Sequence, residues 1–221
     1  MPDLQAVMFD LDGTLVDSLD CYHAVFLESF GQLGLPTVEK AYLLELMRHG
    51  RNILDELIPT DWPERDHTRD SCRQLFREIW DGRAAATVVL HPEVAVTLRA
   101  LKDEGLLVGL ATAASGPWIV RLLQSHDIAT SFDAVVTYAD VRVRKPAPDI
   151  LLRCLELLGA EAARSVYVGD SPIDILAAKA AGVRPIGVLT GASDRASLEA
   201  VEPELILDHV GQLPAVLRTK E

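Results

Sequence analysis

Short apolar runs recur along the chain, and most of them are bounded by Gly, Asp or Thr. They lie at residues 4–9, 106–111, 134–137, 165–168, 185–189 and 205–207. A short continuous apolar run is typical of a strand that is buried on both faces of a parallel sheet. The pattern therefore predicts buried parallel strands at these positions.

Helical spacing of apolar residues fills the gaps between the later runs. The helical segments are residues 92–103, 117–125, 148–158 and 172–181, and several of them open on a proline. Proline is favoured at the first helical position, where its missing N–H would have no partner. The alternation of strands and helices predicts an α/β fold with a doubly wound, mostly parallel, Rossmann-like sheet.

The alternation stops between the first strand and the second. Residues 18–88 show helical spacing with almost no strand candidates, with breaks at residues 34–36 and 59–63, and four short helices fit this segment. We therefore expect a Rossmann-like core of residues 1–16 and 88–221, with a small helical cap domain of residues 17–87 inserted into it. Two short hinges, near residues 16–18 and 84–88, would join them.

Two acidic residues, Asp10 and Asp12, follow the first predicted strand. In an open α/β sheet, ligands bind in the crevice at the carboxyl ends of the strands. Two carboxylates so close together repel each other unless a cation lies between them, and such hard oxygen ligands suit Mg²⁺. The alternative is a turn in which both residues only cap backbone groups and Gly13 supplies a positive φ.

The run at residues 165–168 also leads to an acid, Asp170, which would project into the same crevice or would only cap its strand end. Asp174 has two readings as well. Ser171, Pro172 and Asp174 have the spacing of a helix capping box, and an acid in the first helical turn can also hold a metal-bound water.

Two further strand ends offer groups that could bind a phosphate. Thr112 and Ala113 lie between a strand and a helix, where a hydroxyl and free backbone N–H groups form an anion seat, or where a side chain only caps the helix. Lys145 lies just before Pro146, and a fixed ammonium there would offset charge on a phosphoryl group. Its basic neighbours Arg142 and Arg144 are interpreted as solvated.

Together these residues resemble the four motifs of the haloacid dehalogenase superfamily of phosphohydrolases. The matching positions are Asp10-Leu11-Asp12-Gly13-Thr14, Thr112, Lys145 and Gly169-Asp170 with Asp174. The resemblance covers the whole sheet domain. The place of the insert resembles the helical-cap subgroup that includes phosphoglycolate phosphatases and β-phosphoglucomutases. Ala113 departs from that subgroup, in which Asn often follows the motif threonine.

The resemblance implies a mechanism and a cofactor. Asp10 would attack phosphorus and form an aspartyl-phosphate, while Asp12 would protonate the leaving oxygen and then activate water. Mg²⁺ would be held by Asp10, by the carbonyl of Asp12 and by Asp170. The remaining residues would support these groups: Thr112, Ala113 and Lys145 by holding phosphate oxygens, Thr14 by orienting Asp12 or only closing the turn, and Ser171 and Asp174 from behind the metal site.

Three other functions compete with the phosphatase reading. A β-phosphoglucomutase-like phosphoryl transfer would use the same residues. A 2-haloacid dehalogenase would not need the second aspartate of the first motif, so the presence of Asp12 argues against it. A non-catalytic binding module predicts decay of the motif residues, and none has decayed.

The segment that contains Arg48, His49 and Arg51 is the most informative part of the cap. Two arginines beside Gly50 could reach a second anionic group on the substrate, or could lie in a solvated turn. A small phosphorylated metabolite with a second anionic group, led by a phosphoglycolate-like substrate, is therefore expected.

Charge restricts the partners. The 221 residues include 21 Lys and Arg against 33 Asp and Glu, which gives a formal net charge of −12. This sign excludes binding to nucleic acid or to an anionic membrane through the overall field. It does not exclude a small phosphorylated metabolite, because a metal ion, Lys145 and a helix end would reverse the charge locally. We expect a monomer or a homodimer.

The cysteines and the apolar segments are evidence about the cellular compartment of the protein. Cys21, Cys72 and Cys154 lie far apart and form no C-x-x-C pair, so neither a disulfide framework nor a zinc site is indicated. The first residues do not resemble a signal peptide, and glycine and proline interrupt the most apolar stretch, residues 106–120. We therefore expect a soluble cytoplasmic protein.

Overall fold

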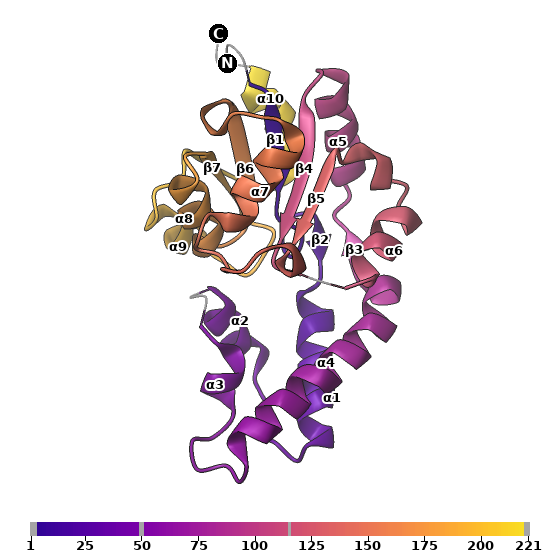
Figure 1. The fold of residues 1–221 in the computed structure, drawn as a ribbon, viewed down its shortest axis with the longest axis vertical. Coiled ribbons are helices and arrows are strands. Elements are labelled where there is room, and N and C mark those ends of the chain that lie inside the picture. The colour runs from indigo at the N-terminus through magenta and orange to yellow at the C-terminus, as the bar shows by residue number, and fades with distance from the viewer. Residues whose placement is uncertain (1–3, 49–50, 115, 219–221) are drawn as a thin grey trace.

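A six-stranded parallel sheet forms the larger part of the molecule (Figure 1). The computed structural model describes residues 4–48, 51–114 and 116–218. The strand order is β5-β4-β1-β6-β7-β8, and every pair in it is parallel. The strands are β1 (Ala6–Phe9), β4 (Leu107–Thr112), β5 (Ala134–Thr137), β6 (Ser165–Gly169), β7 (Arg184–Val188) and β8 (Leu205–Leu207). The predicted α/β fold is confirmed.

Helices cover both faces of this sheet. The elements are α5 (Val94–Asp103), α6 (Trp118–Ser125), α7 (Asp149–Leu158), α8 (Pro172–Ala180), α9 (Arg195–Glu199) and α10 (Leu213–Arg218), with the 3-10 turns η1 (Ala129–Ser131), η2 (Tyr138–Asp140), η3 (Ala162–Arg164) and η4 (Val210–Gln212). Alternate residues of a strand point to opposite faces. Val7 and Phe9 of β1 accordingly pack with α5, α6 and α10, whereas Ala6 and Met8 pack with α7 and α8.

The strand order reverses at β1. From β1 the chain runs outward through β4 to β5, and then returns to the other side of β1 to add β6, β7 and β8. Ligands bind in such open sheets at the carboxyl ends of the strands beside the reversal point. The ends of β4, β1 and β6 are therefore neighbours at the position where a crevice is expected.

The inserted segment is helical, as predicted. It contains α1 (Leu19–Gln32), α2 (Lys40–Arg48), α3 (Ile53–Leu57) and α4 (Arg65–Thr87), which lie together at the lower end of the molecule in Figure 1. We call these four helices the helical insert. Phe26, Phe30, Leu43, Ile58 and Cys72 are buried in a core of their own.

The prediction of four short helices is wrong for α4, which has 23 residues. No proline interrupts residues 65–87, and Cys72, Phe76 and Trp80 recur at a spacing of four, so the helix continues. Its last turns also leave the core of the insert. Trp80 meets Trp118 of α6 edge to face, with ring centroids 5.3 Å apart, so α4 packs against the sheet side of the molecule as well.

A short antiparallel ribbon joins the insert to the sheet. Its strands are β2 (Val16–Asp17) and β3 (Val89–Leu90), paired as Val16 with Leu90 and Asp17 with Val89. The first expected hinge coincides with β2, whereas the second lies inside α4, which continues to residue 87. A strand of two residues shows no periodicity, so the sequence pattern missed this ribbon. The domain boundaries stay a prediction.

No helix in the described ranges is long and apolar enough to cross a membrane. The expected cytoplasmic location and the oligomeric state stay predictions.

Candidate active site

A buried lysine connects the strand ends at the reversal point. The Lys145 side chain is 1% exposed, and it follows β5 in a loop of turns. Its Nζ donates to Asp10 Oδ1 at 2.9 Å, to Asp174 Oδ1 at 2.6 Å and to the Tyr167 hydroxyl at 3.0 Å. An ammonium group has three N–H donors. All three therefore have partners, which come from the end of β1, from α8 and from β6.

Three carboxylates surround this lysine. Asp10, Asp170 and Asp174 are at most 6% exposed, and each offers an oxygen so that the three atoms lie within 4.8 Å of one another. When all three are ionised, one lysine leaves two negative charges uncompensated. Burial raises the pKa of Asp10 to about 7 against the lowering effect of Lys145, and burial also raises the pKa of Asp170. The electrostatics favour a cation at this position.

Two glycines allow the backbone to approach Asp170 closely. A Cβ atom on Gly13, whose φ is +76°, would lie 2.7 Å from Asp170 Oδ2, and one on Gly191 would lie 1.9 Å from it. The same oxygen accepts a hydrogen bond from the Ala192 amide at 2.8 Å. Backbone from the turn after β1 and from the loop after β7 thus encloses this carboxylate.

Asp174 caps a helix and also contacts the buried lysine. Its Oδ2 accepts hydrogen bonds from the Ser171 amide at 3.1 Å and from the Ser171 hydroxyl, as in a capping box at the start of α8. Its Oδ1 accepts from Lys145. One carboxylate thus caps the helix and belongs to the charged cluster.

Asp12 and Thr14 lie in the turn after β1. Asp12 Oδ1 is buried and has no hydrogen-bond partner among the described residues. Burial raises the pKa of this carboxyl, against the lowering effects of a hydrogen bond to Ser18 and the charge of Lys145. A raised pKa suits a carboxyl group that must donate a proton near neutral pH.

The Thr14 hydroxyl does not orient Asp12, because Thr14 Oγ1 also has no partner within the described ranges. Its amide donates to the Leu11 carbonyl at 3.2 Å, which closes the turn instead. Of the two roles expected for Thr14, orienting Asp12 and closing the turn, the described residues show the second.

The candidate phosphate seat lies at the end of β4. Thr112 is fully buried, and its Oγ1 accepts a hydrogen bond from the Ala114 amide at 3.0 Å, whereas Ala113 is exposed. Helix α6 begins at Trp118 with Pro117 before it, so Thr112 does not cap that helix. The seat is therefore a strand end and a bend, separate from the helix start.

The three candidate residues of the insert have different surroundings. The guanidinium of Arg48 donates to the Ala192 carbonyl, with Nη2 at 2.9 Å and Nε at 3.2 Å, and lies 3.5 Å from Asp194. Arg51 forms an ion pair with Glu56 at 3.0 Å on the insert itself. His49 lies outside the described residues. Arg48 alone of the two arginines reaches the sheet side.

Tyr167 is a member of the cluster that sequence reasoning missed. The apolar run at residues 165–168 predicts only a buried strand, yet the Tyr167 hydroxyl contacts Lys145 and Asp174. A signal was available, because a buried tyrosine hydroxyl generally requires a hydrogen-bond partner. A tyrosine in the otherwise apolar run Val166–Val168 therefore indicated a polar group nearby.

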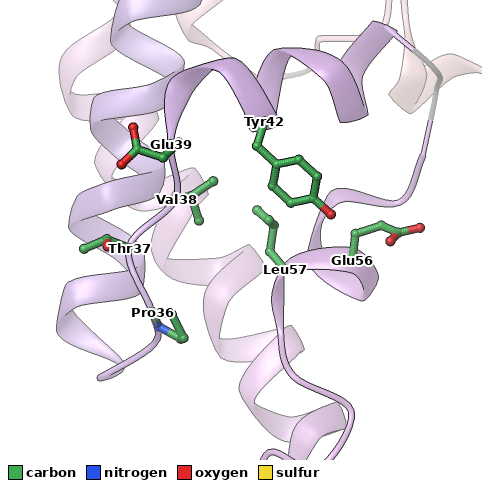
Figure 2. A pocket seen from close by; sticks show the side chains of 7 residues that line it. All are labelled: Pro36, Thr37, Val38, Glu39, Tyr42, Glu56 and Leu57. Atoms are coloured by element: carbon green, nitrogen blue, oxygen red, sulfur yellow. The ribbon is translucent and has the colours of Figure 1, made fainter.

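A separate pocket opens on the insert between α2 and α3, where Tyr42 and Leu57 face each other (Figure 2). Its volume is about 420 Å³, and it also includes Val38, Glu39 and Glu56. None of the motif residues lines it. The strand-end cluster is therefore the candidate active site.

Comparison with known proteins identifies the family of this chain. The family model described as haloacid dehalogenase-like hydrolase matches residues 7–188. A phosphoglycolate phosphatase from Yersinia pseudotuberculosis is 35% identical over 218 residues, which cover 96% of this chain and 93% of the relative.

Solved structures share the fold over the whole chain. A predicted phosphoglycolate phosphatase from Haemophilus somnus superimposes with a TM-score of 0.85 at 22% identity, covering 99% of this chain and all of that one. A protein assigned as a β-phosphoglucomutase from Thermotoga maritima gives a TM-score of 0.71, also at 22% identity, with 98% and 100% covered.

Proposed function

Since this chain belongs to the haloacid dehalogenase-like hydrolases and is a phosphatase, we propose that it hydrolyses a small phosphorylated metabolite through an aspartyl-phosphate on Asp10, with Mg²⁺ as cofactor. The observation that carries the proposal is the buried cluster of Asp10, Asp170 and Asp174 around the single ammonium of Lys145. This cluster lies where an open α/β sheet binds its ligands.

The donor set fits Mg²⁺. The cluster offers hard carboxylate oxygens, carries two excess negative charges when all three are ionised, and lies beside a proposed phosphate seat. Asp10 and Asp170 would hold the ion together with the Asp12 carbonyl, and Asp174 would support them. When bound, the ion supplies charge neutralisation that lets an anionic nucleophile approach an anionic phosphate.

The residues of the chain divide the chemistry between them. The Asp10 carboxylate attacks phosphorus, and the ester oxygen leaves with the proton that Asp12 donates. Asp12 then takes a proton from the water that attacks the phosphorus of the aspartyl-phosphate, which releases phosphate and restores Asp10. Lys145 and Thr112 hold the oxygens of the transferring group in both steps.

Phosphoglycolate is the leading substrate, because the relative at 35% identity carries that name and covers nearly the whole chain. Its carboxylate is a second anion besides the phosphate. Arg48 and Arg51 are the proposed partners of that carboxylate, since an arginine can bind a carboxylate through two parallel hydrogen bonds.

The test is phosphate release from a panel of phosphorylated metabolites, including phosphoglycolate and sugar phosphates, with Mg²⁺ and with EDTA. We expect Mg²⁺-dependent release that is fastest with phosphoglycolate and lost in Asp10→Asn. A protein that releases no phosphate from any substrate with Mg²⁺ would contradict the proposal. Analysis of the organic products separates hydrolysis from transfer between sugar hydroxyls.

A further inference from the structure

Tyr167 makes a set of contacts that packing alone does not require. The residue is fully buried in β6, and its ring lies in the core beneath α7 and α8. The hydroxyl accepts from Lys145 Nζ at 3.0 Å and donates to the Ala111 carbonyl at 2.8 Å. The ammonium also lies 5.6 Å from the ring centroid. The phenol thus connects the lysine to the end of β4.

The Tyr167 hydroxyl links two parts of the proposed site, the Lys145 ammonium and the end of β4. Ala111 directly precedes Thr112, which is a proposed ligand of phosphate oxygens. Asp10 and Asp174 draw the ammonium toward the carboxylate cluster, and Tyr167 is the only neutral group among its three partners. A phenylalanine at this position would fill the core equally well, but it would leave one N–H of Lys145 and the Ala111 carbonyl without this partner.

We propose that Tyr167 is a positioning residue for the phosphatase reaction: its hydroxyl fixes the Lys145 ammonium between Asp10 and the end of β4, where the transferring phosphoryl group would lie. The inference rests on the proposed function, because it concerns the same site. A displaced ammonium would stabilise the transition state less, whereas substrate binding through other groups would change little.

The kinetic test is Tyr167→Phe, assayed with p-nitrophenyl phosphate at saturating Mg²⁺. We expect kcat to fall about tenfold or more while KM changes less than about twofold, since only an interaction made in the transition state is weakened. Inhibition by orthovanadate, which imitates the five-coordinate transition state, should weaken by a similar factor. Inhibition by inorganic phosphate should weaken less.

Two controls separate positioning from packing. Tyr42→Phe removes the same atom from the insert, where the tyrosine lines the separate pocket of Figure 2, and it should leave kcat unchanged. In a Lys145→Met background, Tyr167→Phe should change orthovanadate affinity less than about twofold, because a residue that acts through the lysine has no effect without it.

A readout independent of activity uses the lysine itself. The chain has five lysines, so ¹⁵N-lysine labelling gives few signals, and Lys145→Met assigns the buried ammonium. We expect Tyr167→Phe to shift that signal and to increase its exchange with water. Should the phenylalanine variant not fold, Tyr167→Met removes the hydroxyl with a flexible side chain, and the same results are expected.

The outcomes separate the proposed phosphatase function from the proposed positioning role of Tyr167. A wild-type protein without phosphatase activity overturns the proposed function, and the ammonium signal then decides the placement of Lys145 by itself. An unchanged signal, or an active wild type matched by Tyr167→Phe in kcat, overturns the inference. A variant that loses thermal stability but keeps its kcat shows that Tyr167 only packs the core, which also overturns it.

Discussion

At the scale of single residues, the carboxylate cluster stores electrostatic repulsion that a cation can relieve. Asp10, Asp170 and Asp174 are buried around one lysine, and burial holds the pKa of Asp10 near 7 instead of the ordinary 3.8. A buried charge that lacks a partner costs folding free energy. The residues that would perform the chemistry therefore destabilise the metal-free protein.

This cost predicts a dependence of stability on pH. In EDTA, the native state binds more protons than the unfolded state between pH 3.8 and about 7, so the contribution of Asp10 to the unfolding free energy falls as the pH rises through this window. Urea unfolding at a series of pH values measures the fall. It should be smaller in Asp10→Asn and with saturating Mg²⁺, but unchanged in the exposed control Asp61→Asn. An equally steep fall in Asp10→Asn would show that other groups cause it.

Asp12 gives a second prediction at this scale. Nitrophenolate leaves without a proton, whereas the second step still requires a base. With p-nitrophenyl phosphate, Asp12→Asn should therefore release nitrophenolate in a single burst and accumulate phosphorylated protein, while Asp10→Asn should give no burst. Rapid-mixing absorbance and mass spectrometry measure the two products. Steady turnover by Asp12→Asn would remove Asp12 from the acid and base role.

Some residues of the candidate site can be predicted from the sequence, whereas others cannot. Asp10, Asp12, Lys145 and Asp170 follow from strand ends and spacing, because adjacent parallel strands bring their ends together. The hydroxyl of Tyr167 was missed because its partner lies 22 positions earlier in the chain, and only the fold brings the two together.

At the scale of elements, the packing of α7 on the sheet depends on a missing side chain. Gly109 of β4 faces α7, and a Cβ atom there would lie 2.6 Å from Cys154 Sγ and 3.1 Å from Leu158 Cδ1. Interiors are packed too closely to accept such an atom without displacement. The glycine therefore sets how closely the helix approaches the strand.

We predict opposite effects for two glycine-to-alanine substitutions. Gly109→Ala should destabilise the protein by about 1–3 kcal/mol through overpacking. Gly82→Ala, inside α4 with no atom within 4 Å of the added carbon, should stabilise it by about 0.5–1 kcal/mol, because glycine loses more conformational entropy in a helix. Denaturant unfolding measures both. A neutral Gly109→Ala would show that α7 moves away at little cost.

Periodicity predicts long elements better than short ones. The apolar runs and the proline-led helices identify the sheet and its helical layers, because each element shows several residues of its pattern. The ribbon of β2 and β3 has two residues per strand and carries no such pattern. The length of α4 is an exception that the pattern could have given, because no proline interrupts residues 65–87 and Cys72, Phe76 and Trp80 recur at a spacing of four.

At the scale of the whole molecule, one residue joins the insert to the carboxylate cluster. The Ala192 amide donates to Asp170, and the Ala192 carbonyl accepts both hydrogen bonds from Arg48 of α2. The loop after β7 is thus held from both sides. Any movement of α2 relative to the sheet changes the support of a proposed metal ligand.

This contact predicts an effect of the insert on the metal. Arg48→Ala should weaken Mg²⁺ binding by about fivefold, at the lower end of couplings between sites, because the loop that holds Asp170 loses its outer hydrogen bonds. Calorimetric titration with Mg²⁺ measures the affinity. Arg51→Ala, whose arginine pairs with Glu56 within the insert, is the control and should bind Mg²⁺ as the wild type does. Equal affinities in all three proteins would exclude the coupling.

The ribbon of β2 and β3 bears on how the insert can move relative to the sheet when the Arg48 contact is lost. The two segments that connect the insert to the sheet domain run side by side and are hydrogen-bonded to each other. We therefore expect them to move together as one unit. Arg48 reaches the sheet side at a second place, on α2. The packing of Trp80 of α4 against Trp118 of α6 joins the two parts as well, so loss of the Arg48 contacts would leave the insert attached through the ribbon and through α4. It would also free the loop whose Ala192 amide donates to the Asp170 carboxylate.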